Sequence, residues 1–144
     1  MMVLTLASLL LAGNAMAALS QAEKTEIGIE MTKLFRAARG VIAKNQGLIN
    51  DASKGDKGLS AKKVIAAAKS NYKAASGSAF TQADKSTTKG EAQAAMLAAI
   101  GEVMDNAQAL INEKGKGLKG FLPAIFAKQV ADSFNKLMSG KAHI

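Results

Sequence analysis

The 144-residue sequence contains no cysteine, no tryptophan, one proline and one histidine. Without cysteine there is no disulfide, no thiolate metal site and no CxxCH motif, so covalent attachment of a c-type haem is excluded. Stability must come from packing alone, and with only 4% aromatic residues the core must be mainly aliphatic. The scarcity of proline and of β-branched runs favours helices over strands.

The single histidine restricts the catalytic chemistry that the chain can support. His143 lies next to the C-terminus, where we expect a frayed, solvated residue rather than the base of a catalytic triad. Acidic residues are dispersed along the chain and form no paired-carboxylate pattern. We therefore predict no catalytic residues and no enzymatic activity.

The N-terminus has the features of an export signal. An apolar run spans residues 2–12 and is followed by Ala-Met-Ala at residues 15–17, the small-x-small pattern that a signal peptidase cleaves. We predict a signal peptide that is cleaved between Ala17 and Ala18, leaving a single periplasmic or secreted domain over residues 18–144. An uncleaved membrane anchor is the alternative. No lysine or arginine precedes the apolar run, which indicates a start codon upstream or missing first residues.

Four segments carry apolar residues at three- and four-residue steps, which predicts an all-α protein. We expect these segments to pack as an antiparallel bundle of about four helices. The predicted helices cover residues 20–45, 61–76, 88–111 and 120–139. The last of them carries its apolar residues at Leu122, Ile125, Phe126, Val130, Phe134 and Leu137.

Helix-end signals support these boundaries. Ser20 and Glu23 match a capping box, in which each side chain satisfies an amide of the first helical turn. Thr88 and Glu91 repeat this pattern at the start of the third helix. Pro123 lies near the first turn of the last helix, where its missing N–H costs nothing.

One phrase occurs twice in the chain. QGLINDASKGDKGLS begins at Gln46, and QALINEKGKGLKGF begins 62 residues later at Gln108. In both copies Leu-Ile-Asn ends a long amphipathic helix, and a segment rich in lysine and glycine follows. The first interpretation is a pair of helix-exit loops, in which asparagine and glycine form a left-handed turn and lysine meets the negative end of the helix dipole.

The second interpretation is that the two loops bind an anionic ligand, because glycines expose backbone amides and lysines supply charge. The candidate binding residues are Lys54, Lys57, Lys114, Lys116 and Lys119. Neither loop matches the GxxxxGK(S/T) phosphate loop that follows a strand, so nucleotide binding is not favoured.

Methionines are the remaining candidates for metal or haem ligands. Met31, Met96, Met104 and Met138 fall on the apolar stripes of the predicted helices, which is typical of core residues. We therefore predict no metal site and no cofactor, and non-covalent haem is not favoured either.

Two long segments, RAARGVIAKNQGLINDASKGDKGLS and GKGLKGFLPAIFAKQVA, are similar to the N-terminal part of a family of exported sensor-type domains. This family was long carried as a domain of unknown function, and its best-known member contains haem and has a PAS-like fold. The resemblance implies that the helices form the helical part of a PAS-like α+β sensor domain. The chain ends where the family's sheet begins, so the resemblance also implies a C-terminal truncation or a sheet reduced to a stub.

The formal net charge of +8 favours anionic partners, such as an envelope polymer or an anionic lipid surface. Nucleic acid is not favoured, because aromatic residues that could stack on bases are not interleaved with the basic ones. We predict a periplasmic sensory or small-ligand-binding module whose ligand is a small anionic or apolar molecule. The alternative is a structural or interaction protein of the cell envelope that attaches through its basic surface.

Overall fold

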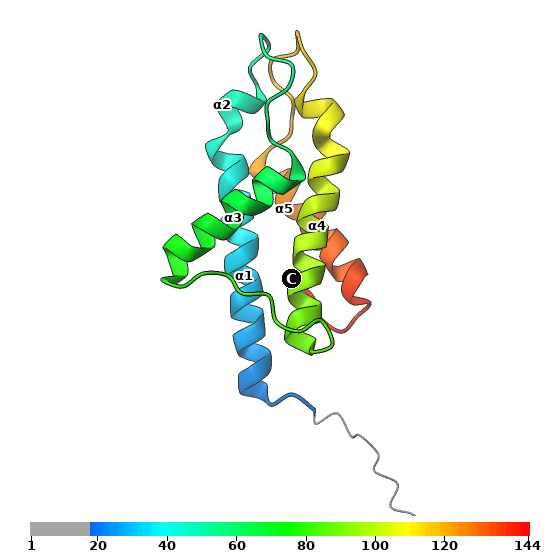
Figure 1. Cartoon of the computed structure of the whole chain (residues 1–144). Helices are drawn as coiled ribbons and strands as arrows, with labels where there is room; N and C mark the ends of the chain where they lie inside the picture. Colours follow the sequence, from blue (N-terminus) through cyan, green and yellow to red (C-terminus); the bar gives the residue numbers. More distant parts are fainter. Residues whose placement is uncertain (1–17) are drawn as a thin grey trace, which may run out of the picture.

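The computed structural model describes residues 18–144, so the predicted signal peptide at residues 1–17 lies outside the described residues. The described part is all-helical and contains no strand, which confirms the predicted all-α bundle (Figure 1). None of its helices is long and apolar enough to span a membrane. The helices are α1 (Gln21–Lys44), α2 (Gln46–Ile49), α3 (Ala61–Ser76), α4 (Thr88–Ile111) and α5 (Pro123–Met138).

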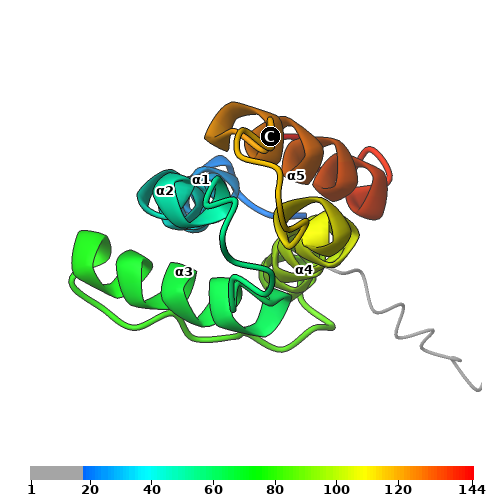
Figure 2. The ribbon, with the colours of Figure 1, turned by 90° about the horizontal axis from the view of Figure 1, so that it is seen from above.

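The two longest helices form the centre of the bundle. Seen from above, α1 and α4 lie next to each other, with α3 on one side and α5 on the other (Figure 2). Helix α1 packs on α3, and in the same way α4 packs on α5. Helix α3 contacts α4, and in the same way α5 contacts α1. This is the pattern expected of two similar halves related by an approximate two-fold rotation.

The chain order agrees with this symmetry. Each half consists of a long helix, a loop rich in lysine and glycine, and a helix of 16 residues. A shift of 62 positions relates the halves, as it relates Gln46 to Gln108. Corresponding residues share the core, because Tyr72 and Phe134 are both buried, as are Val64 and Phe126.

The core is aliphatic, as the composition predicts. All four helical methionines, Met31, Met96, Met104 and Met138, are buried within it, which confirms their assignment as core residues. Flexible thioether side chains fill irregular gaps between packed helices.

The apolar face of α5 differs from the prediction. Leu122, Ile125 and Leu137 were expected on the buried face but are 45%, 42% and 47% exposed. The buried residues recur at strict four-residue steps from Phe126 to Met138. A stripe of this kind is narrow, and apolar residues beside it remain in solvent.

The start of α1 is formed as predicted. The Ser20 hydroxyl accepts a hydrogen bond from the Glu23 amide at 3.2 Å, and the Glu23 carboxylate accepts one from the Ser20 amide at 2.7 Å. Hydrogen bonds from Ser20 lower the pKa of the Glu23 carboxyl group. This reciprocal pair satisfies two amides that the first turn would otherwise leave unpaired.

The start of α4 corrects the prediction by one residue. Thr87, rather than Thr88, is the cap, and its hydroxyl accepts a hydrogen bond from the Gly90 amide at 3.0 Å. The reason is the preceding turn, which closes when the Thr87 amide donates to the Asp84 carbonyl at 3.0 Å. Glu91 closes no capping box and instead pairs with a lysine from the C-terminal segment.

This correction gives a test at the level of stability. Replacing Thr87 with alanine should lower the free energy of unfolding by about 1 kcal/mol, because the Gly90 amide loses its acceptor. The same change at Thr88, which lies inside the helix, should cost well under about 0.5 kcal/mol because alanine is a strong helix former. Urea unfolding of both variants measures the difference. Equal losses would contradict the assignment of the cap to Thr87.

Candidate functional site

The two loops with the repeated phrase lie at the same end of the bundle (Figure 1). They contact each other directly, since the Gly115 amide donates to the Ala52 carbonyl at 2.8 Å. The structure therefore brings the predicted ligand-binding loops together.

The asparagine of each loop holds the backbone of the other loop. The Asn50 side-chain oxygen accepts from the Lys119 amide at 2.9 Å, and the Asn112 side-chain oxygen accepts from the Lys57 amide at 2.9 Å. The prediction of left-handed asparagines is therefore wrong, and their φ angles are −88° and −92°. Their side chains are used between the loops instead of within a helix-ending turn.

The glutamines that open the phrase make a second reciprocal pair. The Gln46 side-chain amide donates to the Phe121 carbonyl, and that of Gln108 donates to the Leu59 carbonyl, both at 3.0 Å. Each loop thus completes its hydrogen bonds with the other half of the chain. Such bonds between segments far apart in sequence cannot form in either loop alone.

Two of the five candidate lysines are buried. Lys57 and Lys119 are each only 5% exposed, whereas the prediction placed them in solvent at helix exits. The Lys57 ammonium donates to the carbonyls of Asp51, at 2.6 Å, and of Lys54. Each of these ammonium groups is thus held by carbonyl oxygens of its own loop.

Lys119 repeats this arrangement in the second loop. Its ammonium donates to the carbonyls of Glu113 and Lys116. Burial lowers the pKa of Lys119, and the positive charge of Lys57 lowers it further. Both buried lysines therefore hold loop backbone together, and their charge is directed into the protein.

The other three candidates, Lys54, Lys114 and Lys116, are exposed. Lys54 lies 3.8 Å from the Asp51 carboxylate, and Lys116 lies 3.4 Å from that of Glu113. Anion binding by these loops stays a prediction, for which only the exposed lysines have free access to solvent.

A larger candidate site lies toward the N-terminal end of α1 and is absent from the sequence-based expectations. It is a cleft of about 930 Å³ between α1, the start of α4, α5 and the C-terminal segment. Its apolar lining residues are Leu19, just before α1, and Ile27, Met31, Ala92, Phe134, Ala142 and Ile144, among others.

The charged residues that line the cleft are all basic. They are Lys24, Lys33, Arg36 and Lys141, with His143 beside them, and no aspartate or glutamate is among the lining residues. Within residues 18–144, Lys24, Lys33 and Arg36 form no ion pair. The cleft therefore combines apolar surface with three basic side chains that form no ion pair within residues 18–144.

The C-terminal wall of the cleft is held in place. The Asn135 side-chain oxygen accepts from the Ile144 amide at 2.9 Å, and the Lys141 ammonium lies 2.7 Å from the Glu91 carboxylate. His143 is exposed, as predicted, but its segment is anchored rather than frayed. The anchored segment gives the cleft a defined wall.

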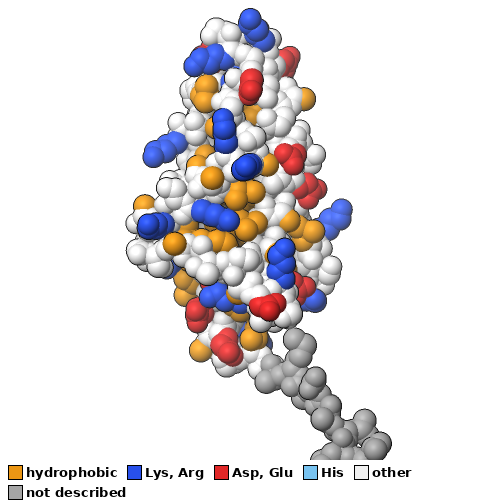
Figure 3. Space-filling model, in the orientation of Figure 1, with side chains coloured by type: hydrophobic (Ala, Val, Ile, Leu, Met, Phe, Trp, Pro, Cys, Tyr) orange, Lys and Arg blue, Asp and Glu red, His pale blue; other side chains and the backbone are white. Residues whose placement is uncertain are grey.

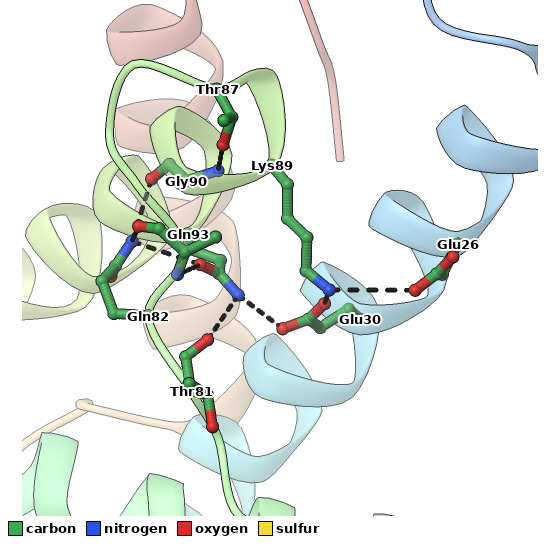
Figure 4. A network of polar contacts seen from close by, with 9 residues as sticks. Glu26, Glu30, Thr81, Gln82, Thr87, Lys89, Gly90 and Gln93 are labelled. Carbon is green, nitrogen blue, oxygen red and sulfur yellow. Dashed lines mark hydrogen bonds and ion pairs between the residues drawn. The ribbon is translucent and has the colours of Figure 1, made fainter.

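The corresponding place on α4 is filled by the chain itself. The segment between α3 and α4 runs along the start of α4, where the fully buried Gln93 binds it (Figure 4). The Gln93 side chain accepts from the Ala83 amide at 2.6 Å and donates to the Thr81 carbonyl at 3.0 Å. It also donates to the Glu30 carboxylate at 2.7 Å.

Glu30 links this network to a lysine. The Lys89 ammonium lies 2.9 Å from the Glu30 carboxylate, and this hydrogen bond raises the pKa of Lys89 (Figure 4). The buried polar groups are thus paired, as burial of polar groups requires. The network fixes the segment between α3 and α4 on the surface of α4.

Two corresponding glycines mark the difference between the halves. At Gly90, a Cβ atom would lie 1.9 Å from the Asp84 carbonyl oxygen, whereas at Gly28 no atom lies within 4 Å of that position. Gly28 lines the cleft. The space beside Gly90 is therefore filled by the segment between α3 and α4, whereas the space beside Gly28 is open and belongs to the cleft.

A sequence signal for the cleft exists only in the comparison of the two halves. A shift of 62 positions places Met31 of the cleft opposite Gln93, the residue that binds the covering segment. The repeated phrase indicates this shift, but the phrase lies at the other end of α1, so the cleft residues are not singled out by it.

The described residues contain no group of three or more histidine, cysteine, aspartate or glutamate side chains that could hold a metal ion. No protein-family model, curated protein or solved structure matches the chain. The resemblance to exported PAS-like sensor domains stays a prediction.

Proposed function

We propose that the protein is a small-ligand-binding module without catalytic activity, and that its ligand occupies the cleft between α1, α5 and the C-terminal segment. The observation that carries this proposal is the lining, which joins apolar side chains to four lysine or arginine residues and, among the described residues, includes no aspartate or glutamate side chain. The ligand is therefore an apolar molecule with an anionic group. Together with the predicted export signal, this makes the protein a candidate periplasmic sensory or small-ligand-binding module.

The apolar and the basic surface of the cleft contribute to ligand binding in different ways. Ligand sites typically enclose about 300 to 1,000 Å³ and are mostly apolar, with few charged groups that orient the ligand. Burial of apolar surface supplies affinity of about 25 cal/mol per Å². The basic side chains then select an anionic group over a neutral or cationic one.

The alternative function, attachment to the envelope through basic surface, rests on the net charge. On the face shown in Figure 3, lysine and arginine side chains are spread out and acidic side chains lie among them. Such a distribution supports weak, salt-sensitive attraction rather than a defined contact surface. The cleft is the more specific support.

Filling the cleft tests the proposed function. Replacing Gly28 with leucine should place a side chain in the cleft, because a Cβ atom there meets nothing within 4 Å. We expect binding of anilinonaphthalene sulfonate, an apolar anionic dye, to weaken by about tenfold or more, which corresponds to a loss of 1.4 kcal/mol or more. Fluorescence titration measures binding, and the melting temperature should not fall, since leucine is a better helix former than glycine.

Gly47 provides the matched control. It is also helical, also has no atom within 4 Å of its Cβ position, and does not line the cleft. Replacing it with leucine should leave dye binding unchanged. Absence of dye binding to the unaltered protein, or equal binding to all three proteins, would refute the proposed function.

A further inference from the structure

The cleft and its counterpart on α4 differ in the kind of chain that they can bind. In the second half, the segment that fills this space is polypeptide, and Gln93 satisfies its backbone groups at Thr81 and Ala83. In the first half, Met31 stands at the corresponding position and is 3% exposed. A methionine offers no amide to pair with a peptide backbone, so buried peptide groups here would lack partners.

The charges of the residues along this space also differ between the two halves. Lys24, Lys33 and Arg36 line the open cleft. A shift of 62 positions places them opposite Ser86, Ala95 and Ala98, which are uncharged. At these three pairs of positions, positive charge is thus present only beside the cleft. It complements an occupant that carries negative charge.

The shape of the cleft favours a linear occupant. Its lining extends along α1 from Lys24 to Arg36, which at 1.5 Å per residue is a length of about 18 Å. On α4, the corresponding space holds a single stretch of chain that forms neither helix nor strand between Ala79 and Asp84. A flexible unbranched chain can follow such a path over its whole length, whereas a rigid fused-ring molecule can occupy only part of it.

On the basis of the proposed function, we propose that the ligand is a linear acyl chain that ends in a carboxylate, a fatty-acid-type molecule. Its chain lies over Met31 and Phe134, and its carboxylate meets Lys33 and Arg36. These two residues lie one helical turn apart on α1. The planar guanidinium group of Arg36 can bind a carboxylate with two parallel hydrogen bonds.

The other end of the cleft is less suited to the carboxylate. Lys141 is already paired with Glu91 at 2.7 Å, which neutralises its charge. Lys24 has no second α1 lysine or arginine within one turn in the lining, so it offers a single donor group where Lys33 and Arg36 offer two. We therefore place the carboxylate of the ligand at Lys33 and Arg36, which defines the orientation of its acyl chain in the cleft.

Isothermal titration of the purified full chain tests the ligand class. The probes are dodecanoate, hexanoate, dodecylammonium, and a peptide with the sequence of residues 79–87. Dodecanoate should bind at one site per chain and about tenfold or more tighter than each of the others, because only it combines chain length with negative charge. Tighter binding of the peptide would overturn the proposal and identify the occupant as polypeptide. Equal binding of hexanoate would also overturn it.

A pair of double variants tests the orientation. Replacing Lys33 and Arg36 with glutamine should weaken dodecanoate binding by about tenfold. The control replaces Arg39 and Lys44, which are exposed residues of the same helix outside the cleft lining, and should change binding by less than about twofold. Equal effects in the two variants would refute the assigned carboxylate site.

The outcomes also separate this inference from the proposed function. If the anilinonaphthalene dye binds and the change of Gly28 to leucine blocks it, the cleft is a ligand site. Failure of dodecanoate to displace the dye would then overturn the acyl-chain proposal alone. If neither the dye nor dodecanoate binds, both proposals fail.

Discussion

Replacing Gly90 with alanine is expected to lower the free energy of unfolding by about 3 kcal/mol or more, which is at the upper end for overpacking of a buried site. The added Cβ atom would lie 1.9 Å from the Asp84 carbonyl oxygen, 2.4 Å from its carbon and 2.8 Å from the Ala83 carbonyl oxygen. All three are backbone atoms, so no side-chain rotation can relieve the clash. The segment between α3 and α4 must move, and its bonds to Gln93 are then lost.

Gly28 supplies the internal control for this result. It occupies the corresponding position of α1, and its Cβ position is open. Alanine there should raise stability by up to about 1 kcal/mol, because alanine has the higher helix propensity. Urea unfolding of the two variants should therefore give changes of opposite sign. A stability change of the same sign and size at both glycines would mean that the segment before α4 does not cover Gly90.

Loss of the two buried lysines is expected to have a second large effect on stability. Replacing Lys57 and Lys119 together with methionine should lower the melting temperature by about 10 °C or more. Methionine keeps most of the side-chain length but cannot donate, so the loop carbonyls that both ammonium groups bind would lose their partners. The sequence alone leads to the opposite expectation, since lysines at exposed helix ends contribute little.

Lys54 and Lys116 are the matched control, because they lie in the same two loops, correspond to each other by the same shift and are exposed. Replacing both with methionine removes the same charge and should shift the melting temperature by less than about 2 °C. Thermal unfolding followed by circular dichroism compares the two double variants. Similar shifts would show that charge, and not the buried contacts, sets the stability of the loops.

Local features of the sequence predict the helices well. The Ser20 cap, the end of α3 before Gly77 and the position of Pro123 all depend on residues within one or two turns. The errors occur where distant residues decide. Thr87 becomes the cap of α4 because the preceding segment is held against this helix by Gln93.

In the loops and in the cleft, too, residues far away in sequence decide the surroundings of a side chain. Lys57 has the sequence surroundings of a solvated loop lysine, yet it is buried, in a loop whose backbone is held by Asn112 of the other loop. Gly28 and Gly90 are both helical glycines. A Cβ atom added at Gly28 would meet open space, whereas one added at Gly90 would meet a carbonyl group. Such differences depend on the path of a segment far from the residue in question, so no window of sequence around it contains them.

The reciprocal contacts between the two loops have a consequence for assembly. The bond from Gln46 to the Phe121 carbonyl joins residues 75 positions apart, and nothing in it requires both to belong to one molecule. The first half of one chain can make the same contacts with the second half of another, which is the condition for domain swapping. The segment between α3 and α4 would be the hinge for that exchange, and its attachment to Gln93 and its tight fit over Gly90 would oppose it.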